Sequence, residues 1–287
     1  MLVDDLSRPG VRVNYDWLKD RDHVQTALLS VTADPFRRLL TDWQPDVVVH
    51  LAAQVGVQAS IKDPEFDLRT NILGTFHVLQ ACRRLARPPL VIFASTNKVY
   101  GDIQVDEPVS EEQPLKFCTP YGCSKGAAEQ YVLDYARVYG LPGVVLRMSC
   151  VYGTRQFGTE EQGWLAHFAR AKQAGESVTV YGTGEQVRDV LFVDDYVRLI
   201  ERLIERRHEV AGEVFNVGGG EWNTISVNEC LRKLGNTKIH HAPERAADQR
   251  YYVSDIAKVR RALGWVPEIG VEEGLDKLQQ WVSQLSR

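Results

Sequence analysis

Tyr121 and Lys125, four residues apart, are the pair in this sequence whose types and spacing are best suited to acid–base chemistry. Thr119-Pro120 precedes them, and a capping threonine followed by proline is typical of the first turn of a helix. Residues four apart share one face of a helix, so the Lys125 ammonium would lie near the Tyr121 phenol. We expect the ammonium to favour the phenolate and to lower the pKa of Tyr121. Such a phenol is suited to remove a proton from a substrate hydroxyl, although the same spacing also occurs among ordinary solvated residues.

A hydroxyl that would complete this site is Thr96, which follows the apolar segment 90–94 in FASTNKVYG. The segment is predicted to be a buried strand, and open α/β sheets bind their ligands at the carboxyl ends of strands. We therefore predict that Thr96 hydrogen-bonds the reacting oxygen. Ser95 is the alternative for this role, and its simpler interpretation is a strand-end serine that caps its own backbone.

The elements that must position these side chains alternate along the chain. Apolar, strand-like segments alternate with helical ones, the pattern of a parallel sheet with crossover helices. The expected strands are 1–4, 46–50, 90–94, 144–146 and 178–182, and VRDVLFVDD at 187–195 is expected to lead into a helix. The expected helices begin at Asp63-Pro64, at Thr119-Pro120 and near Trp164, and the second of them ends at Gly140.

Composition excludes several classes of protein. A formal net charge of -4 without a basic patch argues against a nucleic-acid partner. Apolar segments are too short to cross a membrane, and the N-terminus does not read as a signal peptide, so we expect a cytoplasmic protein without a membrane partner. The five cysteines are scattered and show no metal-ligand spacing, so we predict reduced thiols and no metal site. A pairing of Cys118 with Cys123 is the weaker alternative.

Several motifs together resemble the extended short-chain dehydrogenase/reductase family. They are ASTNKVYG at 94–101, TPYGCSKGAAEQY at 119–131, HLAAQVGV at 50–57, TNILGT at 70–75 and VRDVLFVDDYV at 187–197. The resemblance runs from residue 1 to about 285 and implies a Rossmann-like doubly wound parallel sheet of the α/β class. It implies that residues 1–150 bind NAD and that residues 151–287 form mainly a smaller, interleaved lobe for a nucleotide-sugar substrate. It also implies a homodimer or higher homo-oligomer, formed through helices at 63–86 and 119–139.

The resemblance assigns roles to single residues. Tyr121 would be the acid/base, Lys125 would hold the nicotinamide ribose, and Thr96 would orient the substrate hydroxyl. The residues expected at the cofactor, besides Tyr121 and Lys125, are Asp4, Ser7, Arg8, Leu51, Ala52, Ala53, Gln54, Asn71 and Ser95. Those expected at the substrate, besides Thr96, are Asn97, Ser149, Gln156, Gln162, Trp164, Arg188, Asp248 and Arg250.

Plainer structural interpretations remain open for several of the substrate residues. The guanidinium forks of Arg188 and Arg250 suit a nucleotide diphosphate. For Arg188, the alternative is a surface arginine paired with Asp189. Gln156, Gln162 and Trp164 are equally well explained by core or surface roles.

The residues after Thr96 discriminate between reactions. The family's 4,6-dehydratases have an Asp-Glu pair there, whereas Asn97-Lys98 supplies no carboxyl group for eliminating water. The sequences STNKVYGD, RQFGTEEQGW and GEQVRDVL resemble the CDP-paratose 2-epimerase branch. This resemblance implies epimerisation at C2 of a CDP-linked dideoxyhexose by transient oxidation. An NDP-sugar 4-epimerase, or a related epimerase or dehydratase, is the alternative.

The cofactor end combines one expected residue with one departure from the family. Asp4 in LVDDLSR resembles the acidic residue that accepts hydrogen bonds from a ribose 2′-OH, which favours NAD over NADP. The glycine-rich GxxGxxG turn expected about 20 residues earlier is not found, and NVGGG at 216–220 lacks its spacing. We expect either an N-terminally shortened form or a fold that tolerates the loss by dimerising or repacking. A catalytically silent protein that binds a sugar nucleotide stays open as a further hypothesis.

Overall fold

The computed structural model describes residues 1–103, 106–236, 238–245 and 248–285. The strands are β1 (Leu2–Asp4), β2 (Thr26–Leu28), β3 (Val47–His50), β4 (Leu90–Thr96), β5 (Gly143–Met148), β6 (Cys150–Tyr152), β7 (Val178–Tyr181), β8 (Val187–Phe192), β9 (Val214–Val217), β10 (Thr224–Ser226), β11 (Ile239–Ala242) and β12 (Tyr251–Tyr252). The helices are α1 (Val11–Lys19), α2 (Asp34–Trp43), α3 (Val57–Lys62), α4 (Pro64–Leu68), the π-turn η1 (Arg69–Leu73), α5 (Gly74–Cys82), the 3-10 turn η2 (Asn97–Tyr100), α6 (Pro120–Tyr139), α7 (Trp164–Ala174), α8 (Val193–Glu205), the 3-10 turn η3 (Glu221–Asn223), α9 (Val227–Leu234), α10 (Ala257–Leu263) and α11 (Val271–Leu285).

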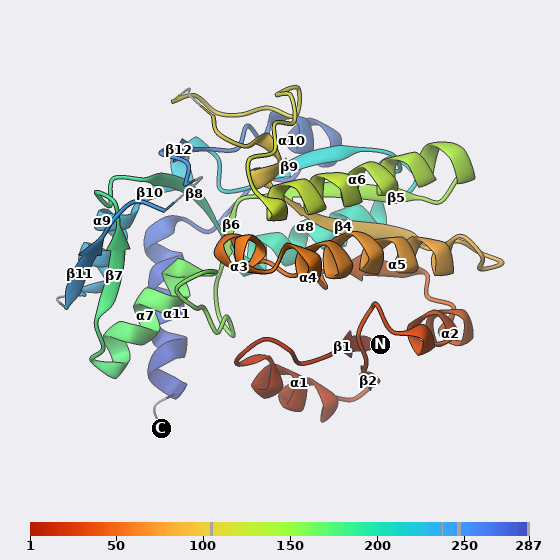
Figure 1. Cartoon of the computed structure of the whole chain (residues 1–287), viewed down its shortest axis with the longest axis horizontal. Helices are drawn as coiled ribbons and strands as arrows, with labels where there is room; N and C mark the ends of the chain where they lie inside the picture. Colours follow the sequence, from red (N-terminus) through yellow and green to blue (C-terminus); the bar gives the residue numbers. More distant parts are fainter. Residues whose placement is uncertain (104–105, 237, 246–247, 286–287) are drawn as a thin grey trace.

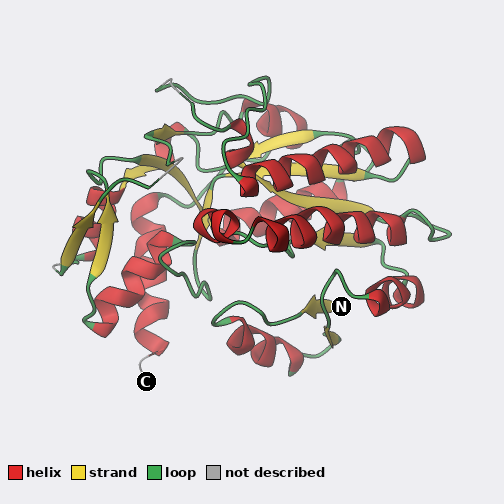
Figure 2. Ribbon diagram, viewed as in Figure 1, coloured by secondary structure: helices red, strands yellow, loops and turns green. Residues whose placement is uncertain are grey.

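The centre of the first lobe is a parallel sheet in the order β3-β4-β5-β9 (Figures 1 and 2). Side chains alternate across β4, where Val91 and Phe93 pack on α2, α5 and α6. Leu90 and Ile92 pack on the opposite face, against α8 and α10. Both faces are covered by helices, which explains why this strand is apolar throughout. The predicted Rossmann-like α/β fold is confirmed.

The second lobe is built around β8, which pairs with β6, β10 and β12. Its core packs α7, α9 and α11 together with β7, which pairs with β11. The two lobes are interleaved in sequence, because β9 and α8 follow residue 150 and yet pack in the first lobe. The domain boundary at residue 150 stays a prediction, since segments after this residue pack in both lobes.

The helix ends and the cysteines test further predictions made from the sequence. Asp63 accepts the Phe66 N–H at 2.9 Å, and Thr119 caps α6 by accepting the Gly122 N–H at 3.1 Å. Gly140 ends α6 at a φ of 65°, a left-handed conformation that suits glycine. All five cysteines are free, so the alternative pairing of Cys118 with Cys123 is wrong. Within the described residues we find no helix long and apolar enough to span a membrane, and no group of side chains arranged to hold a metal ion.

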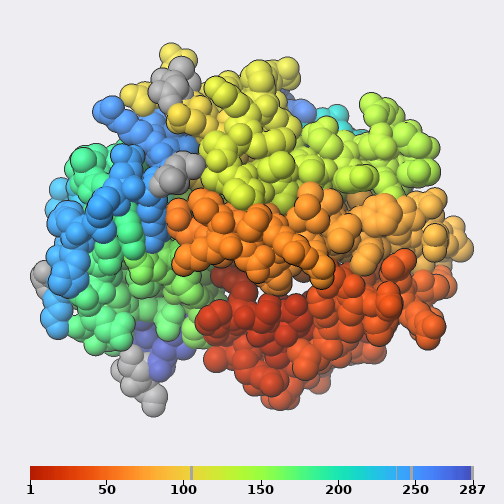
Figure 3. Space-filling view, viewed as in Figure 1, coloured from red at the N-terminus to blue at the C-terminus, as the bar shows by residue number. Residues whose placement is uncertain are grey.

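The N-terminal strands β1 and β2 stand apart from the central sheet, although Val3 of β1 packs against the core of the first lobe. β1 pairs only with β2, and no ladder among the described residues joins β1 to β3. Val49 and Leu51, in and just after β3, are 39% and 54% exposed, and the space-filling view shows an opening between the red N-terminal segment and the orange α3–α5 layer (Figure 3). A hydrogen bond connects the N-terminal segment with the second lobe, because the Asn14 side chain donates to the Arg155 carbonyl at 2.8 Å. Among the described residues, the central sheet therefore ends at β3, and β1 and β2 form a separate two-stranded sheet.

This separation of the two sheets predicts uneven local stability. We expect the backbone amides of β1 and β2 to exchange hydrogen faster than those of β4 by about two orders of magnitude or more, because the two-stranded unit has no buried strand residue. Hydrogen exchange followed by mass spectrometry of peptic peptides measures this difference. Equal protection of the two regions would contradict the expectation that β1 and β2 open more readily than the central sheet.

Candidate active site

Tyr121 and Thr96 meet where the first turn of α6 packs on the end of β4. The Tyr121 phenol is buried and hydrogen-bonds the Thr96 side chain. The approach is close, because a Cβ on Gly122 would come within 2.7 Å of the Lys98 carbonyl oxygen. Ser60 of α3 accepts the Tyr121 backbone N–H at 3.1 Å, which fixes the first turn of α6 from the other side. The structure thus brings together two of the three predicted catalytic residues in direct contact.

Lys125 lies one turn further along α6 and is only 3% exposed. Its ammonium sits 4.2 Å from the centre of the Phe93 ring and donates no hydrogen bond to any described residue. Burial lowers the pKa of Lys125 to about 7, while the Glu129 and Asp67 carboxylates act in the opposite direction. The side chain is therefore a buried cation whose donors are available to a ligand.

One electrostatic prediction is wrong. We expected Lys125 to lower the pKa of Tyr121, but burial raises the pKa of Tyr121 to about 12. The hydrogen bond with Thr96 and the charge of Arg8 act to lower it, and the Asp67 carboxylate acts to raise it. Desolvation of the phenolate outweighs these contacts, because a charged oxygen loses its water shell in this pocket.

A buried ion pair supports the site from below. Glu129 of α6 and Arg147 of β5 are joined at 2.7 Å, and both are buried. Ser95 donates to Glu129 at 2.7 Å, so the interpretation that Ser95 caps its own backbone is wrong. Arg147 also donates to the Tyr100 hydroxyl at 3.0 Å. Helix α6 is therefore fixed to the ends of β4 and β5 by charge as well as by packing.

The loop after β3 is fixed by Asn71, which lies in the short π-helix η1. Asn71 accepts the Gln54 N–H at 2.8 Å and donates to Ser124 of α6 at 2.9 Å. Gln54 and Asn71 both donate to the buried Asp67 carboxylate, at 2.8 and 3.1 Å. Burial raises the pKa of Asp67. The loop that leads into this network consists of Leu51, Ala52 and Ala53. The first two of these residues are exposed to solvent.

Of the predicted residues at the N-terminus, Arg8 lies near the site, since its charge acts on Tyr121. The Asp4 carboxylate accepts the Leu6 N–H at 2.7 Å, so it caps its own turn. Arg8 donates to Gln162 at 2.6 Å, which connects the N-terminal segment with the second lobe. Ser7 is exposed, and its backbone N–H donates to Asp5 at 3.0 Å.

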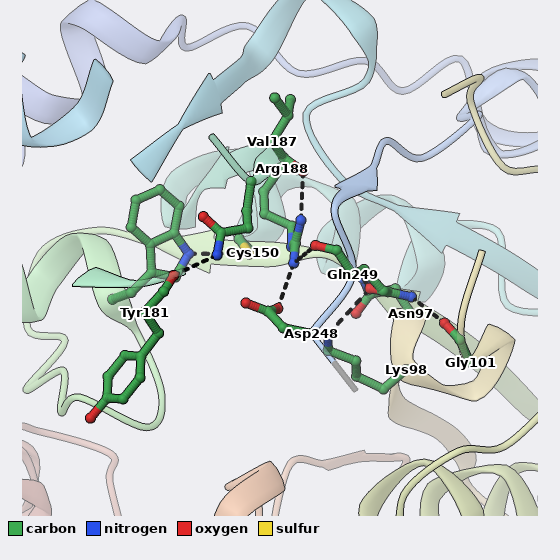
Figure 4. Close-up of polar contacts among 11 residues, drawn as sticks. Asn97, Lys98, Gly101, Cys150, Tyr181, Val187, Arg188, Asp248 and Gln249 are labelled. Atoms are coloured by element: carbon green, nitrogen blue, oxygen red, sulfur yellow. Dashed lines mark hydrogen bonds and ion pairs between the residues drawn. The ribbon is translucent and has the colours of Figure 1, made fainter. Parts of the chain in front are cut away.

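The predicted substrate residues Asn97, Arg188 and Asp248 gather around Gln249 (Figure 4). Arg188 is buried and pairs with Asp248 at 2.8 Å, so the alternative pairing with Asp189 is wrong. Asp189 instead accepts hydrogen bonds from Ser149 and from the Gly220 N–H.

Two other predicted substrate residues lie beside this region, and a third lies apart. Trp164 donates to the Cys150 sulfur at 3.5 Å, and the Gln156 amide donates to the Val151 carbonyl at 3.0 Å. The Gln156 side-chain carbonyl is buried without a partner among the described residues. The side chain of Arg250 is exposed and makes no polar contact with a described residue, so the structure does not bring it to the cluster.

Comparison with known proteins shows the family of the chain and agrees with its fold. The NAD dependent epimerase/dehydratase family matches residues 7–218. The chain belongs to this family. The CDP-paratose 2-epimerase of Salmonella typhi is 36% identical over 311 residues, which cover 99% of the chain and 92% of that protein.

Two solved structures are similar over nearly the whole chain. The UDP-glucose 4-epimerase of Thermotoga maritima, solved with UDP-glucose, has a TM-score of 0.88 at 32% identity, and the match covers 99% of this chain and 91% of that one. The UDP-glucose 4-epimerase of Thermus thermophilus, solved with NAD, has a TM-score of 0.87 at 30% identity, and the match covers 98% and 89%. The resemblance inferred from the motifs, and the prediction of an enzyme, are confirmed.

Sequence reasoning missed several residues of this epimerase/dehydratase site. Glu129 follows Lys125 by four residues, and this helical spacing was the signal that could have identified it. Gln249 was expected only beside Arg250. Its contact with Lys98 joins residues more than 150 positions apart, and no local pattern predicts that contact. Gln186 is buried beside Tyr181, and its side-chain carbonyl has no hydrogen-bond partner among the described residues.

Replacing Lys125 with methionine is expected to raise the free energy of unfolding by roughly 2–4 kcal/mol at about pH 6, because the variant buries no charge. The pKa of Lys125 is lowered in the folded chain, so the unfolded chain binds more protons between about pH 7 and the ordinary lysine value. Wild-type stability therefore rises with pH in that range, and the advantage of the variant shrinks. Urea unfolding at about pH 6, 8 and 10 measures the difference in the free energy of unfolding between variant and wild type. Lys172→Met, at an exposed lysine, is the control. A destabilised variant, or a difference independent of pH, would contradict the burial argument.

Proposed function

We propose that this protein is an NAD-dependent epimerase that inverts C2 of a CDP-linked deoxyhexose. The observation that carries the proposal is the environment of Asn97-Lys98. Asn97 is buried against Thr96 and Gln249, at 3.3 Å from each, and Lys98 donates to Gln249. An acid–base pair for eliminating water would need carboxyl groups at these two positions, whereas transient oxidation needs only the acid/base at Tyr121.

The choice of CDP-sugar and of C2 is supported by sequence. The Salmonella typhi protein is a CDP-paratose 2-epimerase, and it matches the chain from end to end. A UDP-sugar 4-epimerase is the second candidate, favoured by the likeness to the Thermotoga maritima structure with UDP-glucose.

The residues around Lys125 fit the nicotinamide ribose of NAD. A buried ammonium without an acceptor is costly, and the ribose hydroxyls would supply acceptors at that position. Asp4, at the end of β1, would hold the adenosine ribose. No GxxGxxG turn occurs in the chain, so the residues present fit the two ribose ends better than the pyrophosphate.

In the proposed reaction the chain's own residues hold the sugar and move one proton. NAD, when bound, supplies the hydride acceptor and donor. Thr96 and Tyr121 would hydrogen-bond the C2 hydroxyl, and Tyr121 would take its proton and later return it. A phenol with a pKa of about 12 keeps its proton at neutral pH, so the base form needs further stabilisation. Thr96 and Arg8 already act in that direction.

The ketosugar must turn over between the two hydride transfers while the nucleotide stays bound. The Arg188 fork would hold the diphosphate during this turn, as guanidinium groups do at phosphates. Burial of Thr96 and Tyr121 would exclude water from the reacting carbon.

Incubation of the protein with CDP-paratose and NAD in deuterated water tests the reaction. Proton NMR is expected to show inversion at C2 with the original hydrogen retained, since hydride returns to the carbon it left. Tyr121→Phe is expected to lower kcat by about 1000-fold or more, whereas Tyr131→Phe on the same helix keeps wild-type kcat. Deuterium at C2, or inversion at C4 of a UDP-sugar in its place, would overturn the proposal. A folded protein without turnover would favour the silent sugar-nucleotide-binding hypothesis.

A homodimer is the proposed assembly. Leu73 and Val138 are exposed apolar residues on the η1 and α6 helices, whereas Phe76 and Leu133 pack against the core. The double substitution Leu73→Asp and Val138→Asp is expected to convert the dimer into a monomer, because it would bury charges in the proposed interface between the two copies. Light scattering after size exclusion measures the mass. An unchanged mass, or a monomeric wild type, would contradict this assembly.

A further inference from the structure

We propose that Lys98 is a substrate-binding residue that holds the diphosphate together with Arg188, an inference that rests on the proposed nucleotide-sugar function. Lys98 lies in η2, two residues after Thr96. Its backbone carbonyl packs on Gly122, next to Tyr121. The lysine thus begins at the reacting end of the site and extends toward Arg188.

Gln249 connects the two cations. It is 1% exposed, and its side-chain carbonyl accepts hydrogen bonds from Asn97 at 3.3 Å and from the Lys98 ammonium at 3.2 Å. Its amide donates to the Gly101 carbonyl at 2.7 Å, and its backbone carbonyl accepts from Arg188. Figure 4 shows Lys98 and Arg188 reaching the Asp248–Gln249 segment from different elements. One buried residue therefore fixes the spacing between the two charged groups.

The charges in this cluster do not balance. Lys98 and Arg188 are both cationic, and Asp248 is the carboxylate that faces them. Burial and the charge of Arg188 together lower the pKa of Lys98 to about 8, while the Asp248 carboxylate acts to raise it. A half-buried site with one positive charge in excess is stabilised by an anion, and the diphosphate of a sugar nucleotide carries two negative charges that such donors would bind.

The position of Lys98 also bears on which carbon reacts. The diphosphate is attached to C1 of the sugar. The Lys98 backbone N–H donates to the Thr96 hydroxyl at 3.2 Å. A diphosphate held by the side chain of this residue would keep C1 on the side of Thr96 and Tyr121, which would bring C2, the neighbour of C1, to the acid/base. C4 lies across the ring from C1 and would be kept further away.

Calorimetric titration with CDP and with cytidine tests the inference on the folded full chain. Lys98→Met is expected to weaken CDP binding at least tenfold and to leave cytidine binding unchanged, because cytidine has no phosphate. Lys98→Arg is expected to restore most of the CDP affinity, and Lys172→Met, far from the site, to match wild type. Thermal unfolding checks that each variant is folded.

The pH dependence provides a second readout. The groups that face Lys98 are Arg188 of β8, Asp248, Cys150 of β6 and Cys118. Wild-type affinity for CDP is expected to fall as pH rises past about 8, where Lys98 loses its proton, and affinity of Lys98→Arg is expected to stay constant.

Two results would overturn the inference: wild-type CDP affinity in Lys98→Met, or an equal loss for CDP and cytidine. A wild type that binds CDP through Lys98 but does not invert C2 would contradict the proposed function and leave this inference standing.

Discussion

The buried ion pair between Glu129 and Arg147 fixes helix α6 to the carboxyl ends of β4 and β5, and the site depends on that attachment. The first turn of α6 carries Tyr121, the next carries Lys125, and the end of β4 carries Thr96. Breaking a buried pair leaves an uncompensated charge and costs about 3–5 kcal/mol. A shift of α6 would also separate Tyr121 from Thr96, because their contact depends on the close packing of the helix at Gly122. Stability and reactivity thus depend on the same interaction.

Positive charge organises the rest of the site. The Lys125 ammonium faces Glu129 and Asp67 but has no hydrogen-bond acceptor among the described residues. At the other end, Arg188 is paired with the Asp248 carboxylate, whose charge also acts on Lys98. Each cation is held by buried neighbours and keeps donors available. This arrangement suits an anionic, hydroxyl-rich ligand that extends from the ribose of a cofactor to a diphosphate.

Local features were predictable from the sequence, and contacts between distant segments were not. Thr119 and Asp63 cap helices as their residue types predict, and α7 begins at the predicted residue, because these features depend on neighbouring residues. The pairing of Arg188 with Asp248 joins residues sixty positions apart and depends on how β8 meets the later loop. The pKa of Tyr121 was predicted in the wrong direction, since spacing to Lys125 is local while burial is a property of the whole fold. The missing glycine-rich motif predicted a departure from the family at the N-terminus, but the separate pairing of β1 with β2 required the structure.

The central claim is that the Tyr121–Lys125 pocket of this chain holds NAD without a GxxGxxG turn. The most direct measurement is the amount of NAD that stays with the folded protein after gel filtration, quantified by mass spectrometry once the protein is denatured. We predict stoichiometric NAD with the wild type and a marked loss of it in Lys125→Met. A folded wild type that retains no NAD, even after incubation with an excess of it, would contradict the account.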